Sequence, residues 1–256
     1  MEEYLARATA VAHEAGGIIS DSFGIGSKHE LKDDYSPVTD ADRIVNELVI
    51  ARLSEAFPEH SLVGEEGRKE VESEYAWVFD PIDGTVPFLR GVPTNVFALA
   101  LVHHGEPVLG VVHDPHTKRL YHATKGGGAY LNGVSIHTSS RTELERSYIE
   151  TDHHRGFKDF SFFERLHERD VRFLSYSSTI YAQMLVAAGQ IEAVVFPGKR
   201  PWDAAASKVI VEEAGGYTSD LAGNIQRYDK EINGFICAGT KKYHEKLLEV
   251  VGSSLV

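Results

Sequence analysis

The sequence has a single cysteine, Cys237, among its 256 residues. An intrachain disulfide is therefore impossible, and we expect a cytoplasmic location, where thiols stay reduced. The chain also lacks any run approaching 18 apolar residues, so we expect no membrane partner. Residues 1–17 lack a basic segment followed by an apolar one, so we expect no signal peptide.

Basic residues are scarce relative to acidic ones. The chain has 26 lysines and arginines against 38 aspartates and glutamates, which gives a formal net charge of −12. A nucleic-acid polymer is an unsuitable partner for such a chain, because its phosphates require a basic surface. An anionic small molecule would need local cations or bound metal ions, and the excess carboxylates are available to hold such ions.

The N-terminal part predicts two amphipathic helices. Residues 3–20 place small and apolar side chains at helical spacing. A second helix is predicted to begin at Thr39, with Asp42 three positions later as a variant capping box, and to end at Pro58. The polar stretch FGIGSKHELKDDYSP (residues 23–37) predicts a mobile loop between the two helices.

The remainder predicts an α+β fold in two subdomains. Short apolar runs predict mostly antiparallel strands at 61–67 and 77–80, a β-hairpin around HHGEP over 96–114, and further strands at 120–124 and 128–133. Strands and helices then alternate, with strands at 173–176 and 191–196 and helices from Thr179 and over 201–216, which predicts a second α/β subdomain. Placing the boundary within residues 138–147 gives subdomains 1–143 and 144–256.

The stretch WVFDPIDGTVPFLR (residues 77–90) allows two interpretations. Aspartate, proline and glycine are turn-forming residues, so DPIDG is compatible with a simple turn. However, Asp80 follows a short apolar run that predicts a buried strand. Ligand sites gather at the carboxyl ends of strands in open α/β sheets, so Asp80 and Asp83 are also candidates for a site.

Three more acidic residues lie at the ends of predicted elements. Glu65 and Glu66 follow a strand, and Asp203 lies in the first turn of a predicted helix. Taken singly, the glutamates are compatible with solvated loop charges, and Asp203 with an acid favoured by the helix dipole. Taken with Asp80 and Asp83, they predict a site for hard divalent cations such as Mg²⁺, which take oxygen ligands.

Gly84 and Thr85 come directly after this acidic pair. If a helix begins here, its free N–H groups and dipole favour an anion such as phosphate. Glycine would allow a phosphate oxygen to approach the backbone, and the Thr85 hydroxyl would orient a water molecule.

Three motifs in this order resemble the inositol monophosphatase family, within the lithium-sensitive, Mg²⁺-dependent phosphatases that also include fructose-1,6-bisphosphatases. They are GEE (residues 64–66), DPIDGT (residues 80–85) and WDAAA (residues 202–206) followed by EAGG (residues 213–216). The resemblance extends over nearly the whole chain, and it implies a layered αβαβα sandwich. It also implies a homodimer and inhibition by Li⁺.

The resemblance implies a role for each acidic position. One metal ion would be bound by Glu65, Asp80 and the carbonyl of Ile82, and a second by Asp80, Asp83 and Asp203. Glu66 would hold a third, weaker ion through water. Two or three Mg²⁺ ions per site are therefore expected, and Glu65 and Glu66 count among the catalytic residues.

Further positions are implied to act on water and substrate. Asp42 and Thr85 would hold and deprotonate the attacking water, and the N–H groups of Gly84 and Thr85 would bind the phosphate. Asp83 and Asp203 would also face the substrate. Lys32, in the loop of residues 23–37, would reach the site when that loop closes.

The implied reaction is hydrolysis of a small phosphorylated polyol, with inositol-1-phosphate as the expected substrate. The sequence departs from the family pattern where substrates are chosen, because Phe196 stands where a glutamate is common. Lys199 and Arg200 are candidates for binding a second phosphate, although ordinary surface cations explain them equally well. Fructose-1,6-bisphosphate, histidinol phosphate and nucleotide 3′-phosphates therefore stay open, and RGVP (residues 90–93) resembles the histidinol-phosphate branch.

Two other classes of function are weighed against this one. A catalytically inert binding module would have lost a metal ligand, and every ligand position is present. The 13 histidines suggest a zinc site as an alternative, but no HExxH spacing occurs. The pairs His103–His104 and His153–His154 are adjacent, and adjacent strand residues point to opposite faces, so surface or hairpin positions are expected.

Overall fold

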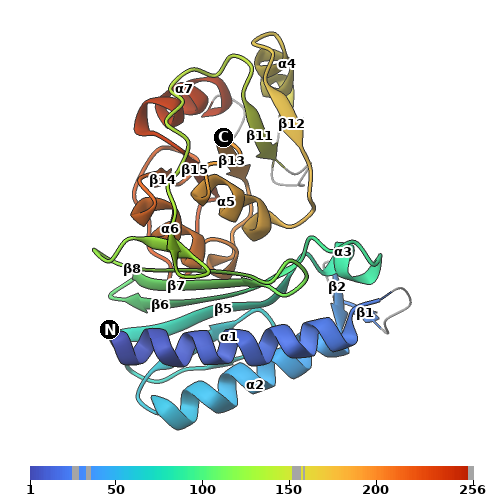
Figure 1. Ribbon diagram of the computed structural model, residues 1–256, viewed down its shortest axis with the longest axis vertical. Helices are drawn as coiled ribbons and strands as arrows, with labels where there is room; N and C mark the ends of the chain where they lie inside the picture. The colour runs from blue at the N-terminus through green and yellow to red at the C-terminus, as the bar shows by residue number, and fades with distance from the viewer. Residues whose placement is uncertain (25–28, 33–35, 152–156, 158, 253–256) are drawn as a thin grey trace.

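The computed structural model of the protein describes residues 1–24, 29–32, 36–151, 157 and 159–252. Helices and sheets alternate in five layers, with two helical layers outside, two sheets inside them and a helical layer at the centre (Figure 1). This arrangement confirms the predicted layered αβαβα sandwich. Within the described residues, no helix has the length and apolar character needed to cross a membrane.

The larger sheet has eight strands, all from residues 61–135. They are β3 (Ser61–Gly64), β4 (Arg68–Lys69), β5 (Tyr75–Asp83), β6 (Val96–His103), β7 (Glu106–Asp114), β8 (Arg119–Thr124), β9 (Ala129–Leu131) and β10 (Val134–Ser135). Their order is β10-β9-β8-β7-β6-β5-β3-β4. Neighbours pair antiparallel except β3 and β5, which run parallel, so the mostly antiparallel first sheet was predicted correctly.

Two long helices cover one face of this sheet, as Figure 1 shows. They are α1 (Glu2–Ser22) and α2 (Asp40–Ala56), and their apolar stripes pack with Trp77, Phe79 and Phe97 into one core. The predicted capping box is confirmed, because Thr39 caps α2 and its side chain accepts from the N–H of Asp42 at 3.3 Å. This cap fixes where α2 begins and therefore where Asp42 lies.

The opposite face of the larger sheet packs against the central helices. These are α5 (Thr179–Ala187) and α6 (Ala205–Glu213), with the 3₁₀ turn η1 (Pro201–Asp203) before α6. Their side chains share a core with Val96, Ala98 and Val112 of the sheet and with Val194 and Cys237 of the second sheet. Cys237 is buried there, as expected of a core residue.

The second sheet has five strands in the order β12-β11-β13-β15-β14. Their bounds are β11 (Tyr148–Thr151), β12 (Arg172–Leu174), β13 (Ala193–Phe196), β14 (Tyr217–Ser219) and β15 (Phe235–Ala238). β11 runs parallel to β12 and β13, and the remaining pairs are antiparallel. The outer helices α4 (Ser161–His167) and α7 (Lys241–Val251) pack on its other face. The division at residues 143 and 144 stays a prediction, because helices from the second half complete the core of the first sheet.

Strand β5 continues past Asp80 to Asp83, so the prediction that the strand ends at Asp80 was wrong. Asp80 pairs with Ala98 and Asp83 pairs with Val96, which leaves three steps along β5 opposite two along β6. The extra residue is a β-bulge. Residues three apart on a regular strand point to opposite faces, but the bulge places Asp80 and Asp83 on the same face, that of Ala98 and Val96. This face is the one covered by α5 and α6.

Two other predicted segments differ from the structure. The helix predicted over 201–216 is broken at Ala204 (φ −142°) into η1 and α6, because Pro201 starts a tight 3₁₀ turn. The stretch 23–37, predicted as a loop, contains the antiparallel pair β1 (His29–Leu31) and β2 (Pro37–Thr39). Residues 25–28 and 33–35 of that stretch lie outside the described residues.

One buried histidine makes the fold sensitive to acid. His244 on α7 is 2% exposed, and its Nε2 lies 2.8 Å from the Ser219 hydroxyl. Because that hydroxyl donates to the Asp220 carbonyl at 2.6 Å, Nε2 is the donor in the contact with Ser219. Burial lowers the pKa of His244 from 6.5 to about 4.

We expect His244→Gln to reduce the acid sensitivity of folding. The unfolded chain binds a proton at this histidine near pH 6.5 and the folded chain only near pH 4, so stability is lost as the pH falls between these values. The loss amounts to about 3 kcal/mol for this residue, and glutamine removes it while keeping a donor toward Ser219. Urea unfolding at a series of pH values tests this, and equal losses in both proteins would contradict it.

Candidate active site

Three segments of the chain bring acidic residues to the bulge of β5. The parallel register pairs Gly64 with Phe79, so Glu65 and Glu66 come level with Asp80. Asp80 and Asp83 lie on either side of the bulge. Asp203, the last residue of η1, approaches from the second half of the chain, where η1 packs against β5 and β6.

Burial and mutual repulsion dominate the electrostatics of this group. The side chain of Asp80 is 2% exposed, and its pKa is raised well above the usual range by burial first and then by Glu65, Asp83, Asp203 and Asp42. The pKa of Asp203 is raised by burial, by Asp83 and by Glu65, and Arg200 and Lys32 oppose this effect. A cation bound between the two carboxyls would therefore stabilise their charged forms.

Lys32 holds the two glutamates. Its Nζ lies 2.6 Å from Glu65 Oε1 and is also hydrogen-bonded to Glu66 Oε1. Partial burial alone would lower the pKa of Lys32, but the two carboxylates outweigh it and the pKa is raised. The structure thus places Lys32 at the acidic group.

Asp83 is held by residues that the sequence did not indicate. Its Oδ2 accepts from the Ser178 hydroxyl at 2.6 Å and from the Ile180 N–H at 2.7 Å. Ser178 is the residue that precedes α5, but its side chain makes no capping hydrogen bond. No local pattern indicates this contact, because 95 residues separate Ser178 from Asp83.

The backbone after the bulge has a shape that only glycine allows. Gly84 has φ 92° and precedes the short helix α3 (Thr85–Leu89). A Cβ atom at this position would lie 2.9 Å from the Ser178 Cβ and 3.1 Å from the Thr94 carbonyl oxygen. The Thr85 hydroxyl donates to the Ile82 carbonyl at 3.2 Å, and the Ile82 N–H donates to Asp80 Oδ1 at 2.9 Å.

Asp42 lies near the glutamates and is held by the helix cap. Its Oδ2 accepts from the Thr39 N–H at 2.8 Å and from the Thr39 hydroxyl at 2.5 Å, and neither bond involves Oδ1. Burial raises the pKa of Asp42 to about 6, against the lowering effect of the two Thr39 bonds, and Glu65 and Glu66 add to the rise.

Lys199 and Arg200 are both exposed on the segment before η1. The Arg200 guanidinium lies 5.6 Å from the centre of the Trp202 ring and 3.6 Å from Glu231, and it lowers the pKa of Asp203. Arg200 therefore faces the acidic group more directly than its neighbour. Lys199 is fixed through its backbone, where its carbonyl accepts from the Ile232 N–H at 2.9 Å.

The donor set suits a hard divalent cation. It consists of oxygen atoms and carries several negative charges. The raised pKa values of Asp80 and Asp203 result from burial first and then from repulsion between the carboxylates, which a cation would relieve. Across the described chain, no three of these carboxylates bring one oxygen each within 4.8 Å of one another. The contacts of Glu65 with Lys32 and of Asp83 with Ser178 explain this spacing.

We expect Ser178→Ala to destabilise the fold by about 1–3 kcal/mol, because it removes a hydrogen bond to a buried charge. Ser207→Ala is the matched control, since the buried Ser207 hydroxyl has no hydrogen-bond partner among the described residues. We expect the control to change stability little. Free energies of unfolding in urea compare the two variants, and equal values would contradict the role given to Ser178.

Comparison with known proteins identifies the family. The profile of the Inositol monophosphatase family matches residues 1–255. An inositol monophosphatase of Dictyostelium discoideum is 34% identical, with 93% of this chain and 91% of the relative covered. A Thermotoga maritima protein named fructose-1,6-bisphosphatase/inositol-1-monophosphatase is 36% identical, with 77% and 74% covered.

A solved structure agrees with these relatives. The Thermotoga maritima IMPase superimposes with a TM-score of 0.89 at 30% identity, over 98% of each chain. The resemblance drawn from the motifs is confirmed. The chain belongs to the inositol monophosphatase family, a family of metal-dependent phosphatases.

Proposed function

We propose that the protein hydrolyses the phosphate monoester of a small polyol with Mg²⁺, and that inositol-1-phosphate is its substrate. The observation that carries this proposal is the convergence of Asp80, Asp83 and Asp203 at the bulge of β5. Buried carboxylates that repel one another are well suited to bind a cation. Membership of the family supports hydrolysis of a phosphate monoester as the reaction. The names of the relatives support inositol phosphate as substrate.

Two or three Mg²⁺ ions are proposed to bind here. Glu65, Asp80 and the Ile82 carbonyl would hold one ion, and Asp80, Asp83 and Asp203 would hold a second. Glu66 would hold a third through water. When bound, the ions supply positive charge that acidifies a water molecule and neutralises the leaving oxygen.

The chain's own groups are proposed to handle the water and the phosphate. Asp42 is suited to take a proton, because its Oδ1 is not engaged by the Thr39 cap and its pKa is raised to about 6. The Thr85 hydroxyl would orient the same water. The N–H groups of Gly84 and Thr85 would bind the phosphate, which can approach closely because Gly84 has no side chain.

Lys32 is proposed to act as an exchangeable cation. Its ammonium neutralises Glu65 and Glu66, at 2.6 Å from Glu65 Oε1. For Glu65 to bind a metal ion, this contact must loosen, and Lys32 would then be released toward the substrate phosphate. Lys32 would thus stabilise the acidic group before Mg²⁺ arrives.

Arg200 favours a second candidate substrate, a sugar bisphosphate. It is an exposed cation whose field reaches Asp203, so an anionic group at the far end of a substrate would meet it together with Lys199. Asp83 and Asp203 would face the substrate between these cations and the metal ions. Histidinol phosphate and nucleotide 3′-phosphates are further candidates.

Four finer properties are proposed as well. Inhibition by Li⁺ and a homodimeric assembly rest on the family resemblance, a cytoplasmic location on the single cysteine, and the division into subdomains 1–143 and 144–256 on the pattern of predicted elements.

We expect phosphate release from inositol-1-phosphate to require Mg²⁺ and to be abolished in Asp80→Asn. The substitution removes a charge that both metal ions share, while its similar shape keeps the bulge folded. Inorganic phosphate is measured with Mg²⁺ and with excess chelator, and thermal unfolding checks the fold. Undiminished turnover in Asp80→Asn, or in chelator, would contradict the metal mechanism.

We expect Arg200→Ala to lower kcat/KM for fructose-1,6-bisphosphate more than for inositol-1-phosphate, by roughly tenfold to a hundredfold. The reason is the loss of a charge-assisted contact with the second phosphate. Lys199→Ala, compared in parallel, should show the smaller of the two effects, because only Arg200 acts on Asp203. Equal losses for both substrates would remove the second-phosphate role and leave a monophosphate as the better candidate.

A further inference from the structure

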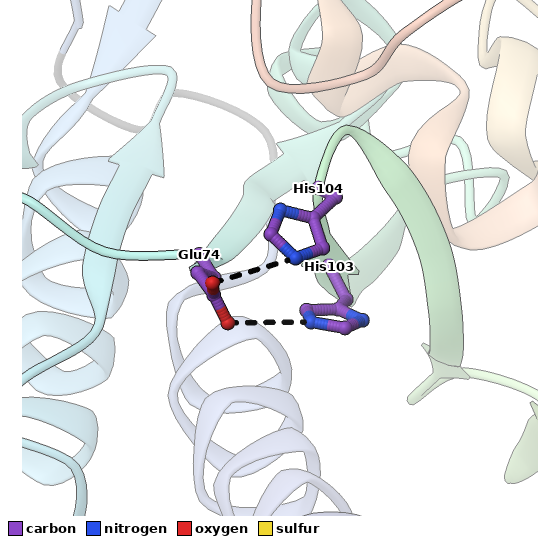
Figure 2. A group of neighbouring side chains, drawn as sticks. All are labelled: Glu74, His103 and His104. Atoms are coloured by element: carbon purple, nitrogen blue, oxygen red, sulfur yellow. Dashed lines mark ion pairs between the residues drawn. The ribbon is translucent and has the colours of Figure 1, made fainter.

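A cluster of two histidines and a glutamate lies at the end of β5 opposite the acidic group. Glu74, His103 and His104 each offer one ligand atom, and these atoms lie within 4.8 Å of one another (Figure 2). The predicted surface or hairpin position is confirmed for His103 and His104, which lie at the β6–β7 hairpin, whereas His153 and His154 lie outside the described residues. The two rings nevertheless do not point to opposite faces. Both rings face Glu74, with Nε2 of His103 3.8 Å from Glu74 Oε2 and Nε2 of His104 3.6 Å from Glu74 Oε1.

The turn between β6 and β7 explains why adjacent histidines converge. His103 pairs with Glu106, so His104 and Gly105 form a two-residue turn. Both have positive φ, 51° for His104 and 86° for Gly105, as in a type I′ hairpin. Histidine tolerates this left-handed conformation better than most residues. The conformation turns the His104 ring away from the direction that it would have on a regular strand.

The His103 ring and the backbone of the turn are held in place before any ligand binds. The His103 ring stacks on Tyr75, with centroids 4.3 Å apart and planes at 14°. The His104 N–H donates to the Glu74 carbonyl at 2.9 Å, which ties the turn to the residue before β5. On the other side of the turn, the Tyr228 N–H donates to the Gly105 carbonyl at 2.9 Å. A rigid set of ligands loses little entropy when an ion binds.

The charges around the cluster permit a cation. Arg227 packs against Gly105, but its guanidinium is paired with Asp229. Glu106 at the end of the turn is paired with Lys125 at 2.7 Å. The carboxylate of Glu74 has no such cation among its described contacts, which are with the two histidines.

We propose that Glu74, His103 and His104 bind a transition-metal dication of the Zn²⁺ or Ni²⁺ class, with water completing the coordination. Imidazole nitrogen is a ligand that these ions prefer and that Mg²⁺ does not. Tetrahedral bonds of about 2.0–2.1 Å place neighbouring ligand atoms about 3.4 Å apart. The histidine nitrogens lie 3.8 and 3.6 Å from the two carboxylate oxygens of Glu74, near this value, and one ligand atom from each residue lies within 4.8 Å of the others.

The site is separate from the acidic group in space and in chemistry. Five residue steps along β5 from Tyr75 to Asp80, the nearest acid on this strand, span about 16 Å at the usual rise of a strand. The cluster is exposed, with 61% of the His104 side chain and 68% of the Glu74 side chain accessible to solvent. An ion bound here would link the β6–β7 turn to the start of β5, so its role is to brace this end of the central strands.

Zinc binding to the intact protein tests the proposal, by competition with a chromophoric chelator in saturating Mg²⁺. We expect one Zn²⁺ equivalent whose affinity falls at least tenfold in each of Glu74→Gln, His103→Gln and His104→Gln. His137→Gln is the matched control, since His137 is an exposed histidine outside the cluster, and we expect it to bind as the unaltered protein does. Zn²⁺ affinity unchanged in all three cluster variants would overturn the proposal.

A second measurement does not depend on the variants keeping their fold. Paramagnetic Ni²⁺ added to the unaltered protein in saturating Mg²⁺ should broaden the ring NMR signals of His103 and His104 at substoichiometric amounts. The ring of His137 should stay sharp under the same conditions. Uniform broadening of all exposed histidines would mean that the ion has no preferred site here, and it would overturn the proposal.

Discussion

The main constraint on the site is the free-energy cost of burying several carboxylates close together. Asp80, Asp42 and Asp83 are each less than 10% exposed, and Asp203 lies close to Asp80 and Asp83. Burial, and then their mutual repulsion, raises the pKa values of Asp80 and Asp203, which makes the group a poor contributor to stability and a good acceptor of cations. The contacts of Lys32 with the glutamates and of Ser178 with Asp83 offset part of this cost.

The backbone positions these acids through three features that act together. The parallel pairing of β3 with β5 brings Glu65 level with Asp80, and the bulge turns Asp83 to the same face. The break at Ala204 sets η1 against β5, so that Asp203 comes from the second half of the chain. The site therefore forms only when both sheets and the central helices are assembled.

Local chemistry explains what could be predicted from the sequence. Apolar periodicity predicted α1, α2 and the antiparallel strands, and Thr39 with Asp42 predicted the cap of α2, because these signals act between near neighbours. The acidic motifs predicted which residues to examine. The bulge, the Ser178 contact with Asp83 and the convergence of His103 with His104 could not be predicted, because each depends on register, on a partner far along the chain or on a left-handed turn residue.

Proton release on Mg²⁺ binding tests the central claim most directly. If the raised pKa values of Asp80 and Asp203 result from a repulsion that cations relieve, Mg²⁺ must displace protons from these groups. Titration calorimetry at about pH 6, in buffers of different ionisation enthalpy, counts the released protons. The account predicts release that diminishes in Asp203→Asn, together with weaker Mg²⁺ binding. Binding without proton release, and equally tight in Asp203→Asn, would contradict it.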